Sequence, residues 1–111
     1  MAGKTIVIDR WHYPARPDTT ADENGDVVLL RQTSLAPAEL FEYGIGPDNR
    51  AFARYQWCEN DFYEENDEQN EISHDELRER MDELIALFRS HGFEEAAIEY
   101  ERLKTQILTR Q

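Results

Sequence analysis

The sequence predicts an α+β domain in which a small antiparallel sheet of about four strands is followed by a C-terminal αα-hairpin packed on one face. Short β-branched or alternating apolar segments fill the first half of the chain, and two amphipathic segments fill its last third. A chain of 111 residues is long enough for one modest core and too short for two. We therefore expect a single domain over residues 1–111.

Two strands are predicted in the first third of the chain. Residues 5–8 are mostly β-branched, and residues 26–33 are apolar on both faces in their middle, as in a central strand. Between them, residues 10–25 contain two prolines, a glycine and several Asp and Thr residues, which predicts a long loop. A loop of this length is uncommon in a compact domain and is usually functional or mobile.

A β-hairpin is predicted over residues 40–58. Phe41, Tyr43 and Ile45 alternate with polar or small residues, and residues 51–58 alternate in the same way. The sequence Gly-Pro-Asp-Asn at 46–49 is a turn signal. Together with the two earlier strands, this hairpin gives the predicted sheet.

The last third of the chain predicts a helical hairpin over residues 73–109. Ser73 followed by Glu76 forms a capping box, which marks the start of the first helix. At 100° per residue its apolar side chains fall on one stripe, made of Leu77, Met81, Leu84, Ile85 and Phe88. The acids of this segment point the opposite way. Gly92 ends the first helix, and the second runs over about 93–108.

The negative charge is concentrated in one block of the sequence. The formal net charge is −12, and residues 59–83 contribute −10 of it, from twelve acids against Arg78 and Arg80. We expect an acidic loop at 59–72 and acids on the outward face of the helix that follows. Such a block repels nucleic acid and anionic lipid, so no direct contact with nucleic acid or with a membrane is expected. The expected partner is a basic protein.

The cysteine content and the N-terminal segment bear on the compartment. Cys58 is the only cysteine, which excludes an intramolecular disulfide and fits a reducing compartment. The apolar run before Asp9 has only three residues, too few for a signal peptide or a membrane span. We therefore expect a cytoplasmic protein.

Metal and catalytic motifs are incomplete. Asp22, Asn24 and Gly25 match three positions of a calcium-binding EF-hand loop, but Thr20 and Arg31 occupy the positions of its first and last ligands. The histidines and the cysteine show no paired zinc spacing, and no nucleophile signature or phosphate-binding glycine loop is present. We expect no metal, no cofactor and no catalytic residue. A general acid and base formed by two of the many carboxylates is the enzymatic alternative that stays open.

The acidic block is predicted to be a binding surface. Phe62 and Tyr63 lie within it, where a purely solvating segment has no use for apolar side chains. Carboxylates along a surface share the sign of a phosphate backbone, and aromatic side chains among them can anchor in a basic groove. The predicted contact residues are Glu59, Asp61, Phe62, Tyr63, Glu64, Glu65, Asp67, Glu68, Glu71, Asp75, Glu79, Asp82 and Glu83.

In size, charge and architecture the chain is similar to small acidic immunity proteins, antitoxins and phage-encoded anti-restriction or anti-CRISPR proteins, without a motif of any one family. We predict a non-enzymatic inhibitor that occludes a basic nucleic-acid-binding surface of its target by polyanion mimicry. Two alternatives stay open. The block can be a solvated face only, or the protein can be a structural or adaptor subunit that forms a homodimer or docks through exposed residues such as Ile98 and Leu108.

Overall fold

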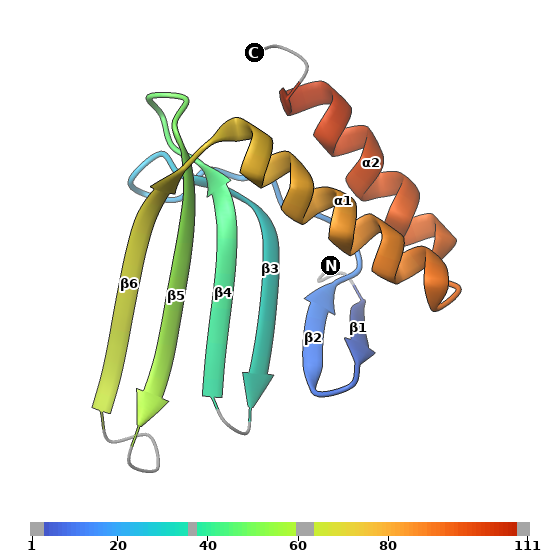
Figure 1. Ribbon diagram of the computed structural model, residues 1–111, viewed down its shortest axis with the longest axis horizontal. Coiled ribbons are helices and arrows are strands. Elements are labelled where there is room, and N and C mark those ends of the chain that lie inside the picture. The colour runs from blue at the N-terminus through green and yellow to red at the C-terminus, as the bar shows by residue number, and fades with distance from the viewer. Residues whose placement is uncertain (1–3, 36–37, 60–63, 109–111) are drawn as a thin grey trace.

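The computed structural model describes residues 4–35, 38–59 and 64–108 (Figure 1). Along these residues the elements are β1 Thr5–Ile8, β2 Trp11–Pro14, β3 Val27–Leu35, β4 Ala38–Ile45, β5 Ala51–Glu59, β6 Glu64–Ile72, α1 His74–Ser90 and α2 Glu94–Leu108. The strands form one antiparallel sheet in the order β1 to β6, so each strand pairs with its neighbours in the chain. The predicted α+β class is confirmed.

The prediction of about four strands is wrong, since the sheet has six. One of the two missed strands, β2, occupies the start of the loop predicted at 10–25, which leaves a shorter loop at 15–26. Asp9 has a left-handed φ of 57°, which aspartate tolerates better than most residues, and this allows a tight turn between β1 and β2. Pro14 argued against a strand in the sequence. A proline is tolerated in a sheet only where no ladder hydrogen bond needs its N–H group.

The other missed strand, β6, replaces most of the acidic loop predicted at 59–72. It pairs with β5 over nine positions, from Glu59↔Glu64 to Ala51↔Ile72. Its sequence, EENDEQNEI, has a single β-branched residue and no aromatic residue, so local propensity does not predict a strand. The backbone ladder with β5 and the packing of Ile72 against the core hold β6 in the sheet.

The remaining elements agree with the sequence. The hairpin predicted at 40–58 consists of β4 and β5, paired over seven positions. At the start of α1, the Ser73 hydroxyl accepts a hydrogen bond from the amide of Glu76 (3.0 Å), as the capping box predicts. Gly92 follows α1 with a left-handed φ of 84°, which ends the helix. The predicted stripe is buried along its whole length: Leu77, Met81, Leu84, Ile85 and Phe88.

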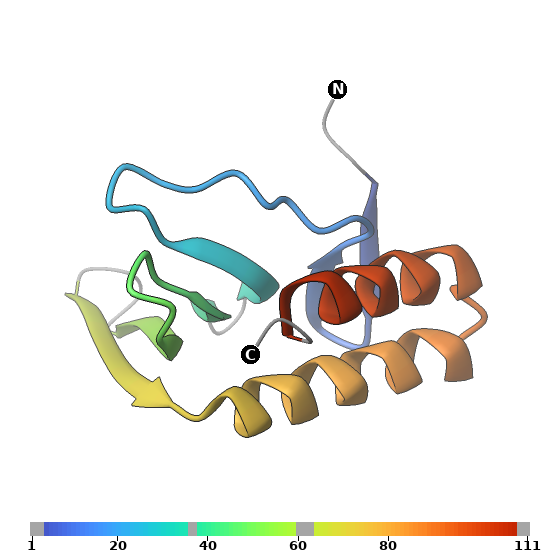
Figure 2. The ribbon, with the colours of Figure 1, turned by 90° about the horizontal axis from the view of Figure 1, so that it is seen from above.

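One hydrophobic core joins strands and helices. The ring of Phe88 in α1 meets Tyr13 of β2 and Tyr100 of α2 edge to face, in both cases with centroids 5.6 Å apart. The Tyr100 hydroxyl donates to the carbonyl oxygen of Pro14 (2.8 Å), and burial raises the pKa of Tyr100, so the donor stays protonated. These contacts attach both helices, which lie side by side (Figures 1 and 2), to the β1–β2 hairpin.

The far halves of β4, β5 and β6 extend away from both helices (Figure 1). Among the described side chains of β6, only Ile72 packs against the core, and it is half-buried. The sheet therefore has one side anchored in the core and one side held mainly by its backbone ladder. No helix in the described part of the chain combines the length and the apolar character that a membrane span requires.

Candidate protein-binding surface

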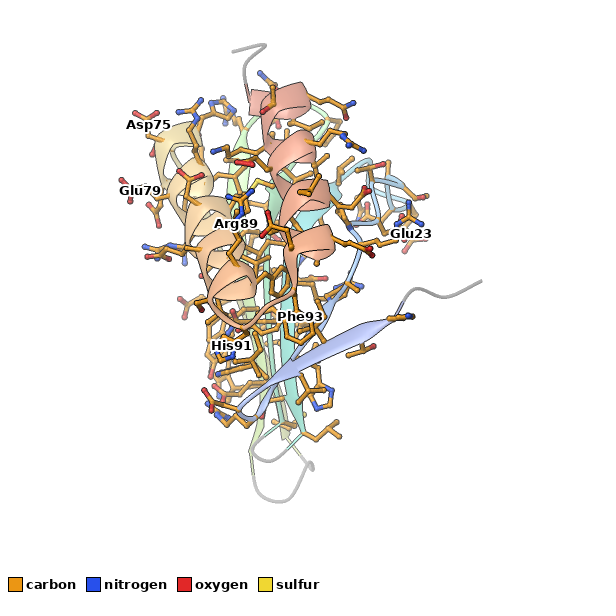
Figure 3. The ribbon with its side chains drawn as sticks, turned by 90° about the vertical axis from the view of Figure 1, so that its right-hand side faces the viewer. Glu23, Asp75, Glu79, Arg89, His91 and Phe93 are labelled. Atoms are coloured by element: carbon orange, nitrogen blue, oxygen red, sulfur yellow. The ribbon has the colours of Figure 1, made fainter. Side chains whose placement is uncertain are left out.

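Seven of the predicted contact residues are exposed on two consecutive elements, β6 and α1. β6 is the last strand of the sheet, and α1 begins two residues after it ends. Figure 3 shows Asp75 and Glu79 projecting from the same side of α1. We refer to these seven residues as the acidic rim: Asp67, Glu68, Glu71, Asp75, Glu79, Asp82 and Glu83.

The other six predicted contact residues are Glu59, Asp61, Phe62, Tyr63, Glu64 and Glu65. Residues 61–63, including both aromatic residues, lie outside the described part of the chain. The remaining three are placed by their backbones only, at the end of β5 and the start of β6. The contact role of these six residues stays a prediction.

β6 presents acids on both faces of the sheet, because successive side chains in a strand point to opposite sides. Glu68 lies on the same face as Ile72, which packs against the core. Asp67 and Glu71 lie on the other face. The strand is therefore an acidic edge that a partner can approach from either side.

Four acids of the rim have basic partners within the protein. The pairs are Asp75–Arg78, Glu83–Arg80, Asp82–Lys104 and Glu71–Arg50. They are partly or fully exposed, so each contributes at most about 1 kcal/mol and can exchange for a cation of a partner. Among the described residues, Asp67, Glu68 and Glu79 form no ion pair, although Glu68 accepts a hydrogen bond from Asn70 (3.2 Å).

A row of aromatic rings, which the sequence did not predict as part of the site, adjoins the rim. Phe41 and Tyr55 stack with centroids 4.3 Å apart, and Tyr55 stacks on Trp57 at 4.7 Å. Trp11 meets Phe41 edge to face at 5.6 Å. All four rings are half-buried, and Tyr55 is the register partner of Glu68. We refer to these rings as the aromatic row; the spacing of Tyr55 and Trp57, two residues apart on one strand, is the sequence signal for it.

Polar groups hold the aromatic row in place. The Tyr55 hydroxyl donates to Glu39 (2.7 Å), and Arg10 pairs with the same carboxylate (2.8 Å) while its guanidinium lies 4.3 Å from the ring centre of Trp11. The hydrogen bond from Tyr55, assisted by Arg10 and opposed by burial, lowers the pKa of Glu39. The same hydrogen bond raises the pKa of Tyr55. Glu39 therefore stays ionised beside a neutral hydroxyl at neutral pH.

Glu42 is the buried carboxylate of the described residues, 6% exposed. Arg31 donates to one of its oxygens (2.8 Å) and Arg54 to the other (2.9 Å). Arg54 also lies 3.8 Å from Asp26. Because both oxygens are engaged by guanidinium groups, Glu42 acts as a structural link between β3, β4 and β5.

The residues that match part of an EF-hand loop form a hydrogen-bonded turn. One oxygen of Asp22 accepts hydrogen bonds from the amides of Asn24 (2.8 Å) and Asp26 (3.0 Å). The Asp22 amide in turn donates to the carbonyl oxygen of Asp26 (2.9 Å). In the described residues, no group of three or more His, Cys, Asp or Glu side chains is arranged to hold a metal ion. Asp22 therefore caps the turn that leads into β3.

Comparisons with known proteins assign no family to the chain. No protein-family model matches it, and neither a curated protein sequence nor a solved structure does. The functional inference therefore depends on the geometry of the acidic rim and of the aromatic row.

Proposed function

We propose that this protein is a small, non-enzymatic acidic binding protein that inhibits a basic target by polyanion mimicry, in the manner of anti-CRISPR, anti-restriction or immunity proteins. The observation that carries the proposal is the placement of the acidic rim on the last strand of the sheet and on the helix directly after it. The target in this account is a nucleic-acid-processing enzyme or toxin. The rim occupies the surface that the target uses for nucleic acid.

The spacing of the acids supports imitation of a single nucleic acid backbone. β6 carries five acids in nine residues. At about 3.3 Å per residue, this is about one charge per 6 Å of strand. One strand of nucleic acid carries about one charge per 3.4 Å, and a duplex about one per 1.7 Å of its axis. The acidic edge is therefore nearer in charge density to one strand than to a duplex, and the acids of α1 extend it.

The regular backbone under the rim favours binding, because a pre-organised surface loses less conformational entropy than a disordered acidic tail. β6 is held by its ladder with β5, and α1 is capped by Ser73. In this account the helical hairpin packs on one face of the sheet and so fixes the angle between β6 and α1. The rim then meets its target as one preformed array of charges.

The aromatic row supplies the apolar contact that a long-lived complex requires. Exposed charges mainly raise the association rate, whereas desolvated aromatic and arginine contacts determine how long a complex lasts. Arg10, held between Trp11 and Glu39, is an example within the protein of a guanidinium accommodated on this face. An arginine of the target can place its guanidinium beside Glu68 and its aliphatic stem along the ring edge of Tyr55.

The proposal is tested by competition with labelled DNA for purified CRISPR effector complexes and restriction endonucleases, followed by fluorescence anisotropy. The double variant Asp67→Lys/Glu68→Lys reverses two charges of the rim. Where the wild-type protein displaces DNA, we expect this variant to be at least about tenfold weaker, because like charges across an interface cost several kcal/mol.

A control variant distinguishes the effect of charge at the rim from the effect of the net charge of the protein. The triple change Ala21→Lys/Glu23→Lys/Gln106→Lys alters the net charge by the same +4 at exposed positions outside the rim. We expect it to displace DNA within about twofold of wild type. An equal loss in both variants would show that only net charge matters, and no loss in the rim variant would refute the proposed surface.

A second candidate function rests on Ile98, an apolar side chain of α2 that is 41% exposed. In this alternative the protein is a structural or adaptor subunit that forms a homodimer or docks into a larger assembly through the helical hairpin, and the acidic segment serves solubility. Ile98→Glu would dissociate such a dimer and would leave an inhibitor that uses the rim unaffected. The molar mass of both forms, measured by light scattering, distinguishes the two functions.

A further inference from the structure

A groove lies between β1 and the start of α2, at the opposite edge of the sheet from β6. Its volume is about 810 Å³, within the range of ligand-binding sites. Figures 1 and 2 show that the end of the helical pair, where α1 passes into α2, extends beyond β1. Figure 3 shows Phe93 at this end, beside β1. The apolar residues that line the groove are Ile6, Ala15, Phe93 and Ala96.

The side of β1 that faces away from β2 is an open strand edge. No further strand pairs with β1 among the described residues. The amide of Ala15 donates to the carbonyl oxygen of Lys4 (2.8 Å), and positions of an antiparallel pair alternate between bonded and non-bonded. Thr5 and Val7 are therefore positions that form no backbone hydrogen bond with β2. This agrees with Pro14, which lies opposite Thr5 and has no N–H group to donate. Their N–H and C=O groups point to the open edge.

Phe93 gives the groove an apolar wall beside this edge. Its side chain is 38% exposed, although its ring packs edge to face against Phe88 with centroids 6.4 Å apart. Aromatic side chains in such positions are typical anchors for a bound chain. A strand added to β1 would turn every second side chain toward the helical side, where Phe93 lies.

The helical side of the groove is acidic. Glu94, Glu95 and Glu99 line it. Glu94 lies 3.3 Å from Arg89 and Glu99 lies 3.7 Å from Arg102, and these partly exposed pairs can exchange for the cations of a bound segment. A second copy of this chain would bring another net charge of −12 and be repelled, whereas a segment that carries Lys or Arg is attracted. Charge complementarity therefore selects a basic segment as the occupant.

We propose that this groove binds an extended segment of a basic protein by strand addition to β1. The backbone of the segment pairs with Thr5 and Val7, an apolar side chain packs on Phe93, and Lys or Arg side chains two residues away, on the same side of the segment, face the glutamates of α2. Lys4 and Arg16, which also line the groove, repel these cations and so orient the segment toward the helix. The inference goes beyond the proposed function, because the groove and the acidic rim share no residue.

The test is amide hydrogen exchange, followed by NMR, on the full chain with and without a synthetic acetylated and amidated peptide of Lys-Thr-Val-Thr repeats, in which lysine and valine project from the same side of the strand. In the free protein, we expect the amides of Thr5 and Val7 to exchange fast and those of Ile6 and Ile8 to be protected. At a peptide concentration about ten times Kd, exchange at Thr5 and Val7 should slow about tenfold, since only the free fraction exchanges. Unchanged exchange at these two amides would overturn the proposal.

Two variants and one further peptide complete the test. Phe93→Ala should weaken peptide binding about tenfold, and Ile98→Ala, which removes a comparably exposed side chain outside the groove, should change it by less than about twofold. A peptide with glutamate in place of lysine should bind at least about fivefold more weakly. Equal effects of the two variants, equal binding of the two peptides, or chemical-shift changes confined to the acidic rim would overturn the proposal. None of these results bears on the competition assay, which depends on Asp67 and Glu68.

Discussion

The two edge strands of the sheet, β1 and β6, limit unwanted pairing with other chains in different ways. An open edge exposes backbone groups that can pair with other chains, and natural sheets limit such pairing with short strands or with charged side chains. β6 has nine residues and five acids, whereas β1 has four residues and an exposed Val7. We propose that the protection by charge makes β6 a surface for cations, and that the protection by length leaves β1 able to accept a backbone.

The edges also differ in what holds them. β1 and β2 contribute Ile6, Ile8 and Tyr13 to the buried core, which also contains residues of both helices. β6 contributes the half-buried Ile72 and depends otherwise on its ladder with β5. We therefore expect substitutions of buried residues that pack with β1 and β2 to reduce stability far more than substitutions on β6.

Phe88→Ala should have the largest effect, because it removes a ring that is 0% exposed and contacts Tyr13, Phe93 and Tyr100. We expect the free energy of unfolding to fall by about 3–5 kcal/mol, measured by urea denaturation. The matched change Phe93→Ala, at a 38% exposed position, should cost about 1 kcal/mol or less. Similar losses in the two variants would contradict a core centred beneath β1 and β2.

Glu42→Gln tests the middle of the sheet, between the two edges. The variant leaves Arg31 and Arg54 without the charge that both contact. Since Arg31 is partly exposed, we expect a loss of about 2 kcal/mol in the free energy of unfolding, below the range for a fully buried pair. Glu68→Gln on β6, measured in the same way, is the control. A loss no larger than that of the control would mean that Glu42 has no structural role.

Tyr55→Phe should reduce the acid sensitivity of the protein. The Tyr55 hydroxyl lowers the pKa of Glu39 in the folded state, so the unfolded chain binds more protons and stability rises with pH through this range. The contribution is present above the ordinary carboxyl pKa of 4.5 and is lost as the pH falls through the folded value. Urea midpoints between about pH 3 and pH 6 should show a shallower slope in the variant and a loss of about 1 kcal/mol at the upper end. Parallel curves would contradict this role of Tyr55.

Asp67→Asn/Glu68→Gln should have the smallest effect on folding. Both side chains are exposed and form no ion pair among the described residues, and a less negative chain repels itself less. We expect the free energy of unfolding to change by less than about 0.5 kcal/mol, measured by urea denaturation. A loss above about 1 kcal/mol would mean that these side chains hold β6 in place.

The sequence predicts the helices well because their signals are local. The hydroxyl of Ser73, the left-handed Gly92 and the spacing of the apolar stripe each act within a few residues, and all are confirmed. β6 was missed because its strand conformation comes from backbone pairing with β5, and its own residues carry little β propensity. β2 was missed because a proline usually argues against a strand. Only the register shows that Pro14 lies opposite Thr5, where no ladder hydrogen bond needs an N–H group.

The candidate surfaces likewise contain residues that the sequence alone reveals and residues that only the fold brings together. The acids of the rim are visible in the sequence, because charge can be counted along the chain. The aromatic row requires knowledge of the register, since Phe41 and Tyr55 meet only through the pairing of β4 with β5. The groove at β1 combines Ile6 with Phe93, which are far apart in the chain and meet only in the folded protein.

Whether the acidic rim is the surface for a basic partner can be measured by an amide NMR titration with an oligo-arginine peptide at low salt. We predict chemical-shift changes concentrated at residues 67–71 and 75–83. Asp18, Asp22 and Glu23, exposed acids of the loop at 15–26, serve as internal controls and should shift much less. Shifts spread over all exposed acids alike, or strongest in that loop, would show that the acidic rim is not the binding surface.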